Sequence, residues 1–221
     1  FWESCKLPGI IKKFNPDVIL NMANRGIVSC QFPQAILVQD SHLFYPFSNF
    51  GRISTKKRFK FWYHKRHFKR ALKSTGLIFC QTDIAMHRIR EIYGNGYKIA
   101  LCPNHVSQYS KPKIEPFIPK IIQPFGNKFK LFVLTRYYEQ KNLEIIPELF
   151  KQYQEQLRDV LVIFTITREE HPNAAKILNA IQKYNLHDNI ITAGLLKQEE
   201  LAAYYIHSDA LFLPTLLESF S

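Results

Sequence analysis

A chain of 221 residues can form one large domain or two small ones, and 46% hydrophobic residues provide enough apolar surface for a packed core. Lysine and arginine outnumber acidic residues by 30 to 18, so the net charge of +12 favours an anionic partner: a phosphorylated substrate, acidic lipid or nucleic acid. No apolar run in the sequence approaches the roughly 18 residues of a membrane-spanning helix, which excludes such a helix within these residues.

The first half of the chain contains short apolar runs that each end in polar residues, as buried parallel strands do. Thr82 fits the N-cap of a helix that Gly94 ends, whereas Pro8 interrupts a helical pattern at about 5–14. The predicted strands are 17–23, 34–40, 76–81 and 98–103.

The most biased segment is 52–75, which contains ten Lys or Arg residues, two His residues and no acidic residue. Phe61, Phe68 and Leu72 recur near helical spacing, which predicts a one-sided helix over 52–73. Three interpretations of this helix stay open. It is a solvated helix whose aromatic face packs on its own domain, a membrane-surface helix attracted to anionic lipid, or a nucleic-acid patch with stacking aromatic residues.

The composition changes at 103–124, a segment that contains five prolines and shows almost no hydrophobic periodicity. Proline can neither donate to a sheet nor continue a helix. We therefore predict an N-terminal domain at 1–107, a Pro-rich connection at 108–128 and a C-terminal domain at 129–221.

Beyond the connection, all-apolar runs alternate regularly with amphipathic segments. This alternation predicts an α/β domain with a parallel sheet covered on both faces, a doubly wound Rossmann-like fold. The predicted strands are 130–135, 160–166, 189–194 and 210–215, and the predicted helices are about 142–156, 172–184 and 197–208.

All strands of a parallel sheet end at the same edge, where α/β proteins bind ligands. Two cations and a helix N-terminus after the first strand suggest a bound phosphate or diphosphate, and a carboxylate there can accept hydrogen bonds from sugar hydroxyls. The edge therefore suits a diphosphate joined to a polyhydroxylated ring, with solvated loop charges as the alternative. The residues that follow the four strands are Arg136 and Lys141, then Thr167 and Arg168, then Gly194, and finally Pro214, Thr215 and Glu218.

Several other kinds of site have no sequence pattern here. The sequence contains no P-loop, no G-x-G-x-x-G fingerprint, no H-E-x-x-H pair, no D-x-D metal stretch and no G-x-S-x-G elbow. The four cysteines form no C-x-x-C pair, and we interpret them as reduced structural residues, with Cys80 and Cys102 buried at the ends of apolar runs.

At this point the second half resembles a known family. The sequence TRYYEQKN at 135–142 resembles the G-R-x-x-x-x-K-G turn of family 4 retaining glycosyltransferases of the GT-B fold, and LFLPTLLESFS at 211–221 resembles their PS-x-x-E-G-F-G segment. Residues 186–210 look like the stretch that the family has between them. The first half is similar more loosely: AILVQDSH at 35–42 stands where the family often has an H-D turn, and KIALCPNHVS at 98–107 resembles the V-I-P-N-G-V-D run.

The resemblance implies two Rossmann-like domains, the second binding a nucleotide sugar and the first the acceptor. It implies sugar transfer with retention of configuration and without a metal or other cofactor. Arg136 and Lys141 match the residues that hold the donor diphosphate, and Glu218, with Thr215 and Gly194, is expected on the donor sugar or nucleotide. Glu218 matches the first of two family glutamates; the second would follow the last residue, so we expect a fragment with both domains incomplete.

The resemblance also implies a glycan, lipid-linked or other acceptor and an enzyme of cell-envelope polysaccharide synthesis. Such an enzyme would be cytoplasmic and peripheral at the inner face of a membrane, touching anionic lipid through 52–73, with no nucleic acid partner. A sugar-phosphate or phosphorylase-type transferase of the same fold is a third interpretation. The rival class is a non-catalytic module that binds anionic lipid or nucleic acid through 52–73.

Some positions depart from the family pattern. Thr135 and Asn142 stand in place of the glycines of the first turn, which leaves the identity of the donor open. Gln39 occupies the position of the usual acceptor-side histidine, and His42 lies three residues further on. His42 is therefore the candidate catalytic residue, and the alternative is a turn histidine without a chemical task.

Overall fold

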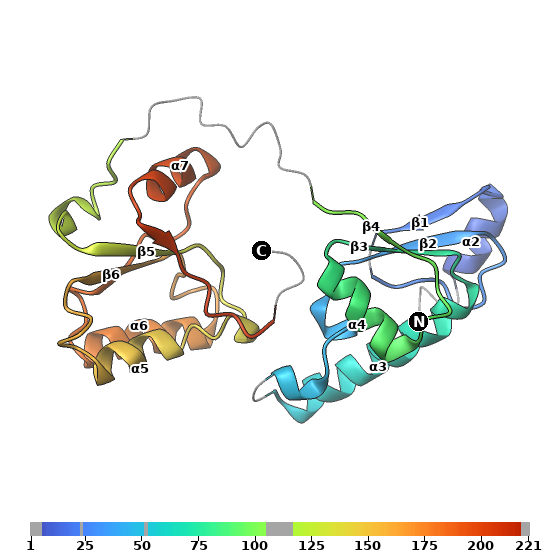
Figure 1. Cartoon of the computed structure of the whole chain (residues 1–221), viewed down its shortest axis with the longest axis horizontal. Helices are drawn as coiled ribbons and strands as arrows, with labels where there is room; N and C mark the ends of the chain where they lie inside the picture. Colours follow the sequence, from blue (N-terminus) through green and yellow to red (C-terminus); the bar gives the residue numbers. More distant parts are fainter. Residues whose placement is uncertain (1–5, 23, 51–52, 105–116, 218–221) are drawn as a thin grey trace. The chain divides into compact units, whose positions relative to one another are not determined.

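The computed structural model describes residues 6–22, 24–50, 53–104 and 117–217 (Figure 1). The chain divides into two compact units, the first consisting mainly of Phe1–His105 and the second of Val106–Leu216. Each unit is built on a four-stranded sheet whose strands all run parallel. The predicted pair of Rossmann-like α/β folds is therefore confirmed.

The sheet of unit 1 has the strand order β1-β2-β3-β4, so its strands follow one another in sequence. All four predicted runs form strands, each shorter than predicted. In the register of the sheet, Ile36 pairs with Ile78, and Ile78 pairs with Ile99. The strands are β1 (Ile19–Asn21), β2 (Gln34–Val38), β3 (Leu77–Cys80) and β4 (Ile99–Leu101).

Among the described residues, three α-helices accompany this sheet: α2 (Leu7–Phe14), α3 (Thr55–Ala71) and α4 (Asp83–Tyr93). Pro8 does not interrupt α2, because it lies in the first turn, where its missing N–H group has no helical partner to lose. Thr82 caps α4 by accepting a hydrogen bond from the Ala85 N–H at 3.2 Å, and Gly94 ends the helix with a φ of 97°.

Helices α3 and α4 share one hydrophobic core with β2 and β3. Phe68 of α3 and Ile89 of α4 are fully buried against Ile36 and Ile78 of the sheet. Leu72 is buried with them just after α3, as the helical spacing of the aromatic segment predicts. The inner face of α3 therefore packs on its own unit, and what remains open is the function of its outer face.

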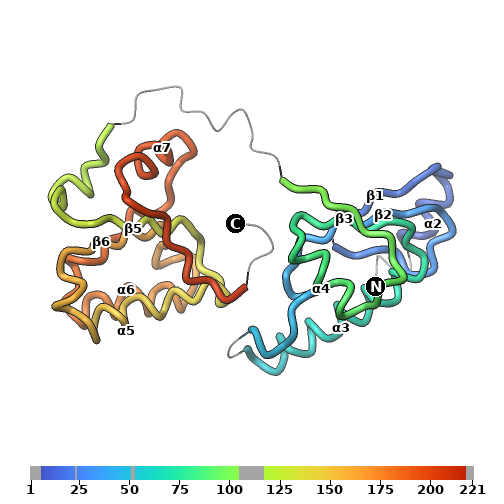
Figure 2. The backbone as a smooth tube through the Cα atoms, in the orientation of Figure 1, coloured from blue at the N-terminus to red at the C-terminus, as the bar shows by residue number. Residues whose placement is uncertain are grey.

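The sheet of unit 2 has the order β7-β6-β5-β8, in which the chain crosses from one side of β5 to the other. Helices α5 (Ile145–Gln152) and α6 (Pro172–Lys183) lie on one face of the sheet and α7 (Gln198–Ile206) on the other (Figure 2). The strands are β5 (Phe129–Val133), β6 (Val160–Phe164), β7 (Ile190–Thr192) and β8 (Ala210–Leu211).

Alternate residues of the central strands supply two cores, one on each face. Val162 and Phe164 pack beneath α5 and α6, whereas Leu161 and Ile163 pack on the α7 side. A strand buried on both faces must be apolar throughout, which is why the sequence shows continuous rather than alternating apolar runs.

Most element boundaries in unit 2 differ from the sequence expectation by one to four residues, and the structure explains two of the differences. The predicted helix at 142–156 begins three residues late, because Glu139–Lys141 forms a short 3₁₀ turn that Asn142 ends in the left-handed conformation, with a φ of 53°. The predicted connection at 108–128 also holds more structure than a linker, since Ile122 is 1% exposed and belongs to the core beneath α7.

The cysteines of the described residues differ in burial. Cys30, Cys80 and Cys102 are free thiols, and Cys80 is buried, but Cys102 is exposed, as is Leu101 before it at the end of the edge strand β4, so its predicted burial is wrong. Cys5 lies outside the described residues.

Among the helices of the described ranges, none combines the length and the apolar character that crossing a membrane requires.

Candidate functional site

The carboxyl edge of the unit 2 sheet is where the predicted ligand-binding residues meet. Its strands end at Val133, Phe164, Thr192 and Leu211, and the loops that follow them leave from this edge. Because all four strands are parallel, residues from four distant parts of the sequence gather there.

The turn after β5 is tied to the end of β6 by one buried hydroxyl. Thr165, 5% exposed, accepts a hydrogen bond from the Thr135 N–H at 2.9 Å, and its Oγ1 donates to the Thr135 carbonyl at 2.8 Å. Thr135 thus leaves the strand with both backbone polar groups satisfied. This contact fixes the path of the chain immediately before Arg136.

Tyr137 anchors the middle of the same turn. Its backbone N–H donates to Glu170 Oε1 at 3.1 Å, its ring stacks on His171 with centroids 4.6 Å apart, and its phenol oxygen accepts from Asn173 Nδ2 at 3.1 Å. The phenol also donates to the Glu144 carboxylate. Burial, followed by this hydrogen bond, raises the pKa of Tyr137 to about 12, so the phenol stays protonated at neutral pH.

The two predicted diphosphate-binding cations flank this anchor on the same turn. The Arg136 side chain is exposed to solvent, and Lys141 is half-buried in the Glu139–Lys141 turn. The buried ring of Tyr137 between them holds the backbone from which both side chains extend. The structure therefore places Arg136 and Lys141 on the same fixed turn at the carboxyl edge.

The segment after β8 is joined directly to this turn. Thr215 Oγ1 donates to the Gln140 carbonyl at 3.0 Å, and the Leu216 N–H donates to the same oxygen at 2.8 Å. Thr215 is thus placed beside the cationic turn, as the parallel sheet predicts, although 75 residues separate it from Gln140. Glu218 lies outside the described residues, so its placement stays a prediction.

Gly194 follows β7 in a conformation that suits glycine. Its φ is 70°, and its N–H donates to Thr192 Oγ1 at 3.2 Å. A methyl group added at Gly194 would lie 3.9 Å from Thr167 Cγ2, so backbone conformation, not lack of space, favours glycine. Gly194 and Thr167 are therefore neighbours at the edge, as predicted.

Arg168 is placed differently from the other predicted cations. Its guanidinium donates to the side-chain carbonyl of Asn179 in α6. That hydrogen bond directs the group towards the helix, so the predicted set of two or three edge cations is reduced to Arg136 and Lys141. The sequence could not show this, because Asn179 lies 11 residues further along the chain.

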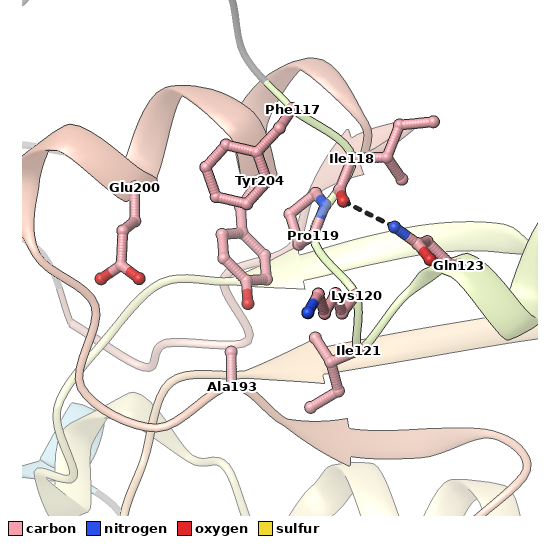
Figure 3. Close-up of a pocket in the computed structure, with 9 residues that line it drawn as sticks. All are labelled: Phe117, Ile118, Pro119, Lys120, Ile121, Gln123, Ala193, Glu200 and Tyr204. Carbon is pink, nitrogen blue, oxygen red and sulfur yellow. Dashed lines mark hydrogen bonds between the residues drawn. The ribbon is translucent and has the colours of Figure 1, made fainter.

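A pocket of about 720 Å³ opens beside the edge, on the α7 face of unit 2 (Figure 3). Its lining is mostly apolar, with the Lys120, Gln123 and Glu200 side chains as polar groups. Ala193, the residue before Gly194, lines the pocket on the side of the carboxyl edge. The sequence did not indicate this pocket, because one of its walls belongs to the predicted connection at 108–128. The residues that form most of its lining are Phe117, Ile118, Lys120, Ala193, Glu200 and Tyr204.

His42, the candidate catalytic residue of unit 1, is largely buried. It lies in the 3₁₀ turn Ser41–Leu43 just after β2, with 13% of its side chain exposed. Its ring stacks on Phe61 with centroids 4.6 Å apart, and its Nε2 lies 3.1 Å from His64 Nδ1. Burial, and then the charges and rings around it, lower the pKa of His42 to about 3, so it is neutral at physiological pH.

The partners of His42 could not be found from the sequence, because His64 comes from α3, 22 residues away. Within the described parts of the chain, no group of three or more His, Cys, Asp or Glu side chains is arranged to hold a metal ion.

We predict that Thr165→Val destabilises unit 2 by about 1–3 kcal/mol, because the Thr135 N–H loses the hydroxyl that it donates to. Chemical unfolding monitored through unit 2 measures the effect. Thr165→Ser is the matched control, since it keeps the hydroxyl group. Equal stability of the valine and serine variants would show that the contact does not hold the turn.

The sequence of unit 2 is similar to a known protein family. Residues 115–221 match the family model described as glycosyl transferases group 1. No sequence among the curated proteins matches the chain significantly.

Solved structures match the fold along most of the chain. Sucrose-phosphate synthase from Thermosynechococcus elongatus matches with a TM-score of 0.66 at 14% identity, over 97% of this chain and 54% of that one. A glycosyltransferase from Rickettsia africae matches with a TM-score of 0.61 at 16% identity, over 95% of this chain and 54% of that one. Anabaena HepE in complex with UDP and glucose matches with a TM-score of 0.56 at 11% identity, over 87% of this chain and 49% of that one.

The chain thus spans about half the length of these structures, and at such identities the likeness concerns the fold. The sequence match covers the unit whose carboxyl edge carries Arg136, Lys141 and Thr215. The chain has the GT-B fold, and its residues 115–221 are similar to the glycosyl transferases group 1 family.

Proposed function

We propose that the protein transfers a sugar from a nucleotide-sugar donor to a glycan, lipid-linked or other acceptor, with retention of configuration at the anomeric carbon. We place it with the family 4 retaining enzymes, on the resemblance of 135–142 and 211–221. The observation that carries the proposal is the junction at Gln140, where the turn bearing Arg136 and Lys141 is bonded to the segment bearing Thr215.

The donor end of this proposal follows from the charge that develops during transfer. When the bond to the sugar breaks, the nucleoside diphosphate departs with growing negative charge, which fixed cations stabilise. Arg136 offers a planar fork for two phosphate oxygens, and Lys141 adds a point charge beside it. The pocket at Ala193 offers room for the nucleoside, and Anabaena HepE, a protein of the same fold, binds UDP and glucose.

The acceptor end is assigned to unit 1, and we place the protein at the inner face of a membrane, as in the synthesis of cell-envelope polysaccharide. Helix α3 supports a peripheral contact with anionic lipid, because it carries eight Lys or Arg residues and no acidic residue. On its outer face, Phe59 and Trp62 are 67% and 48% exposed, and their rings stack with centroids 5.6 Å apart. Exposed aromatic rings among cations are typical of membrane-surface helices.

We predict that Arg136→Ala or Lys141→Ala in the complete protein lowers sugar transfer by about 10²-fold, the scale of losing one group that stabilises charge in the transition state. Transfer rates with the preferred donor from a screen of UDP-, GDP- and ADP-sugars measure the effect. Arg158→Ala is the control, since Arg158 is exposed and lies just before β6, at the opposite edge of the same sheet. Activity within a few-fold of wild type in both edge variants would contradict the assignment.

We also expect transfer to survive removal of divalent metal ions, because the proposed site stabilises the diphosphate with side-chain cations and backbone dipoles. The rate before and after dialysis against EDTA is the measurement. A rate that falls to background and returns with added Mg²⁺ or Mn²⁺ would contradict this part of the proposal.

The membrane contact predicts that Lys69→Glu/Arg70→Glu weakens binding to phosphatidylglycerol vesicles at least tenfold, since each basic residue near an anionic surface contributes about 1 kcal/mol. Vesicle co-sedimentation measures this, with transfer to a soluble acceptor staying unchanged. The matched control is Lys12→Glu/Lys13→Glu, an exposed pair in the last turn of α2 with the same change of charge. Equal losses in both variants would point to net charge alone, and loss of oligonucleotide binding instead would favour the rival nucleic-acid module.

A further inference from the structure

Four polar side chains form a line at the carboxyl edge of the unit 1 sheet. An Arg25 guanidinium nitrogen lies 2.9 Å from His64 Nε2, and His64 Nδ1 lies 3.1 Å from His42 Nε2. His42 Nδ1 in turn lies 3.8 Å from Asp40 Oδ2. The line therefore runs from the segment between β1 and β2, through α3, to the loop that follows β2.

The chemistry of arginine gives this line a direction. A guanidinium can only donate hydrogen bonds, so His64 Nε2 must accept and carries no proton. Neutral His64 then has its proton on Nδ1, which donates to His42 Nε2. His42 in turn carries its proton on Nδ1, the nitrogen that faces Asp40. A second proton on either ring would set two donors against each other.

The surroundings keep His42 neutral and fix the far end of the line. Phe61 covers one face of the His42 ring, and the cations Arg25, Lys60 and Lys65 oppose its protonation, which together with burial lowers its pKa. The loop itself is held by Asn24, whose Oδ1 accepts from the backbone N–H of Asp40 at 2.8 Å and from that of Gln39.

Asp40 is the exposed end of the line. Its side chain is 53% exposed, against 13% for His42. A buried ring whose two nitrogens both face protein groups is not placed to take a proton from a substrate, whereas an exposed carboxylate accepts hydrogen bonds from hydroxyl groups.

We propose that Arg25, His64 and His42 form a polarised hydrogen-bond relay that turns the Nδ1 proton of His42 towards Asp40, an electrostatic contact at 3.8 Å, and that Asp40 binds a hydroxyl group of the sugar acceptor. The proposal rests on the proposed function, which assigns the acceptor to unit 1. His42 is then a positioning residue rather than a catalytic one, since it acts on the substrate through Asp40.

Nitrogen-15 NMR of the complete protein, labelled at histidine, tests the relay without any substrate. Between pH 6 and 8 we expect the His42 and His64 rings to be neutral, with the proton on Nδ1 and a bare Nε2. His42→Gln is expected to preserve the His64 signal, because the glutamine Oε1 can accept from His64 while its Nε2 donates to Asp40. A proton on Nε2 of either ring in the wild type would overturn the relay.

Binding of octyl β-D-glucopyranoside, measured by saturation-transfer NMR, tests the role of Asp40. We expect Asp40→Asn and His42→Phe each to weaken binding about tenfold or more, the scale of a hydrogen bond to a charged group. His42→Gln should restore most of the affinity, and His87→Gln, an exposed histidine on α4, should not change it.

Absence of binding to the wild type, or equal binding by Asp40→Asn, would overturn the role of Asp40. Neither measurement needs a nucleotide sugar, so failure of the proposed transfer activity is distinguished from failure of the relay.

Discussion

The carbonyl oxygen of Gln140 is the point on which the candidate donor site depends. It accepts two hydrogen bonds, from the Thr215 hydroxyl and from the Leu216 N–H, and so joins the loops after β5 and β8. Thr165 and Tyr137 fix the same turn from the β6 and α6 sides. A flexible loop would lose entropy on binding a diphosphate, whereas a turn tied at three places has lost that freedom on folding.

The architecture could be predicted from the sequence because its signals are local. Strands covered on both faces must be apolar throughout, so every strand of both sheets appeared as a short apolar run, and the parallel arrangement then placed Thr215 beside the 135–142 turn. The boundaries were less accurate. The start of α5 depends on the left-handed conformation of Asn142, and the burial of Ile122 depends on a core formed by strands that come later in the chain.

What the sequence could not show were contacts between distant side chains. In the sequence Arg168 resembles an edge cation, whereas in the structure its guanidinium donates a hydrogen bond to Asn179. His42 resembled an isolated turn histidine, although its partners His64 and Arg25 approach from α3 and from the segment before β2. Such contacts depend on how helices pack against the sheet, and no spacing along the chain encodes them.

Helix α3 shows how one biased segment can serve two purposes. Its outer face exposes Phe59 and Trp62 among cations, and its inner face supplies His64 to the line that ends at Asp40. The positive charge of Lys60 and Lys65 opposes protonation of His42, so the cations of this helix also help to keep the buried ring neutral. Packing of 52–73 on its own unit therefore does not exclude binding of anionic lipid or of nucleic acid, because packing uses the inner face of the helix and the exposed aromatic rings lie on its outer face.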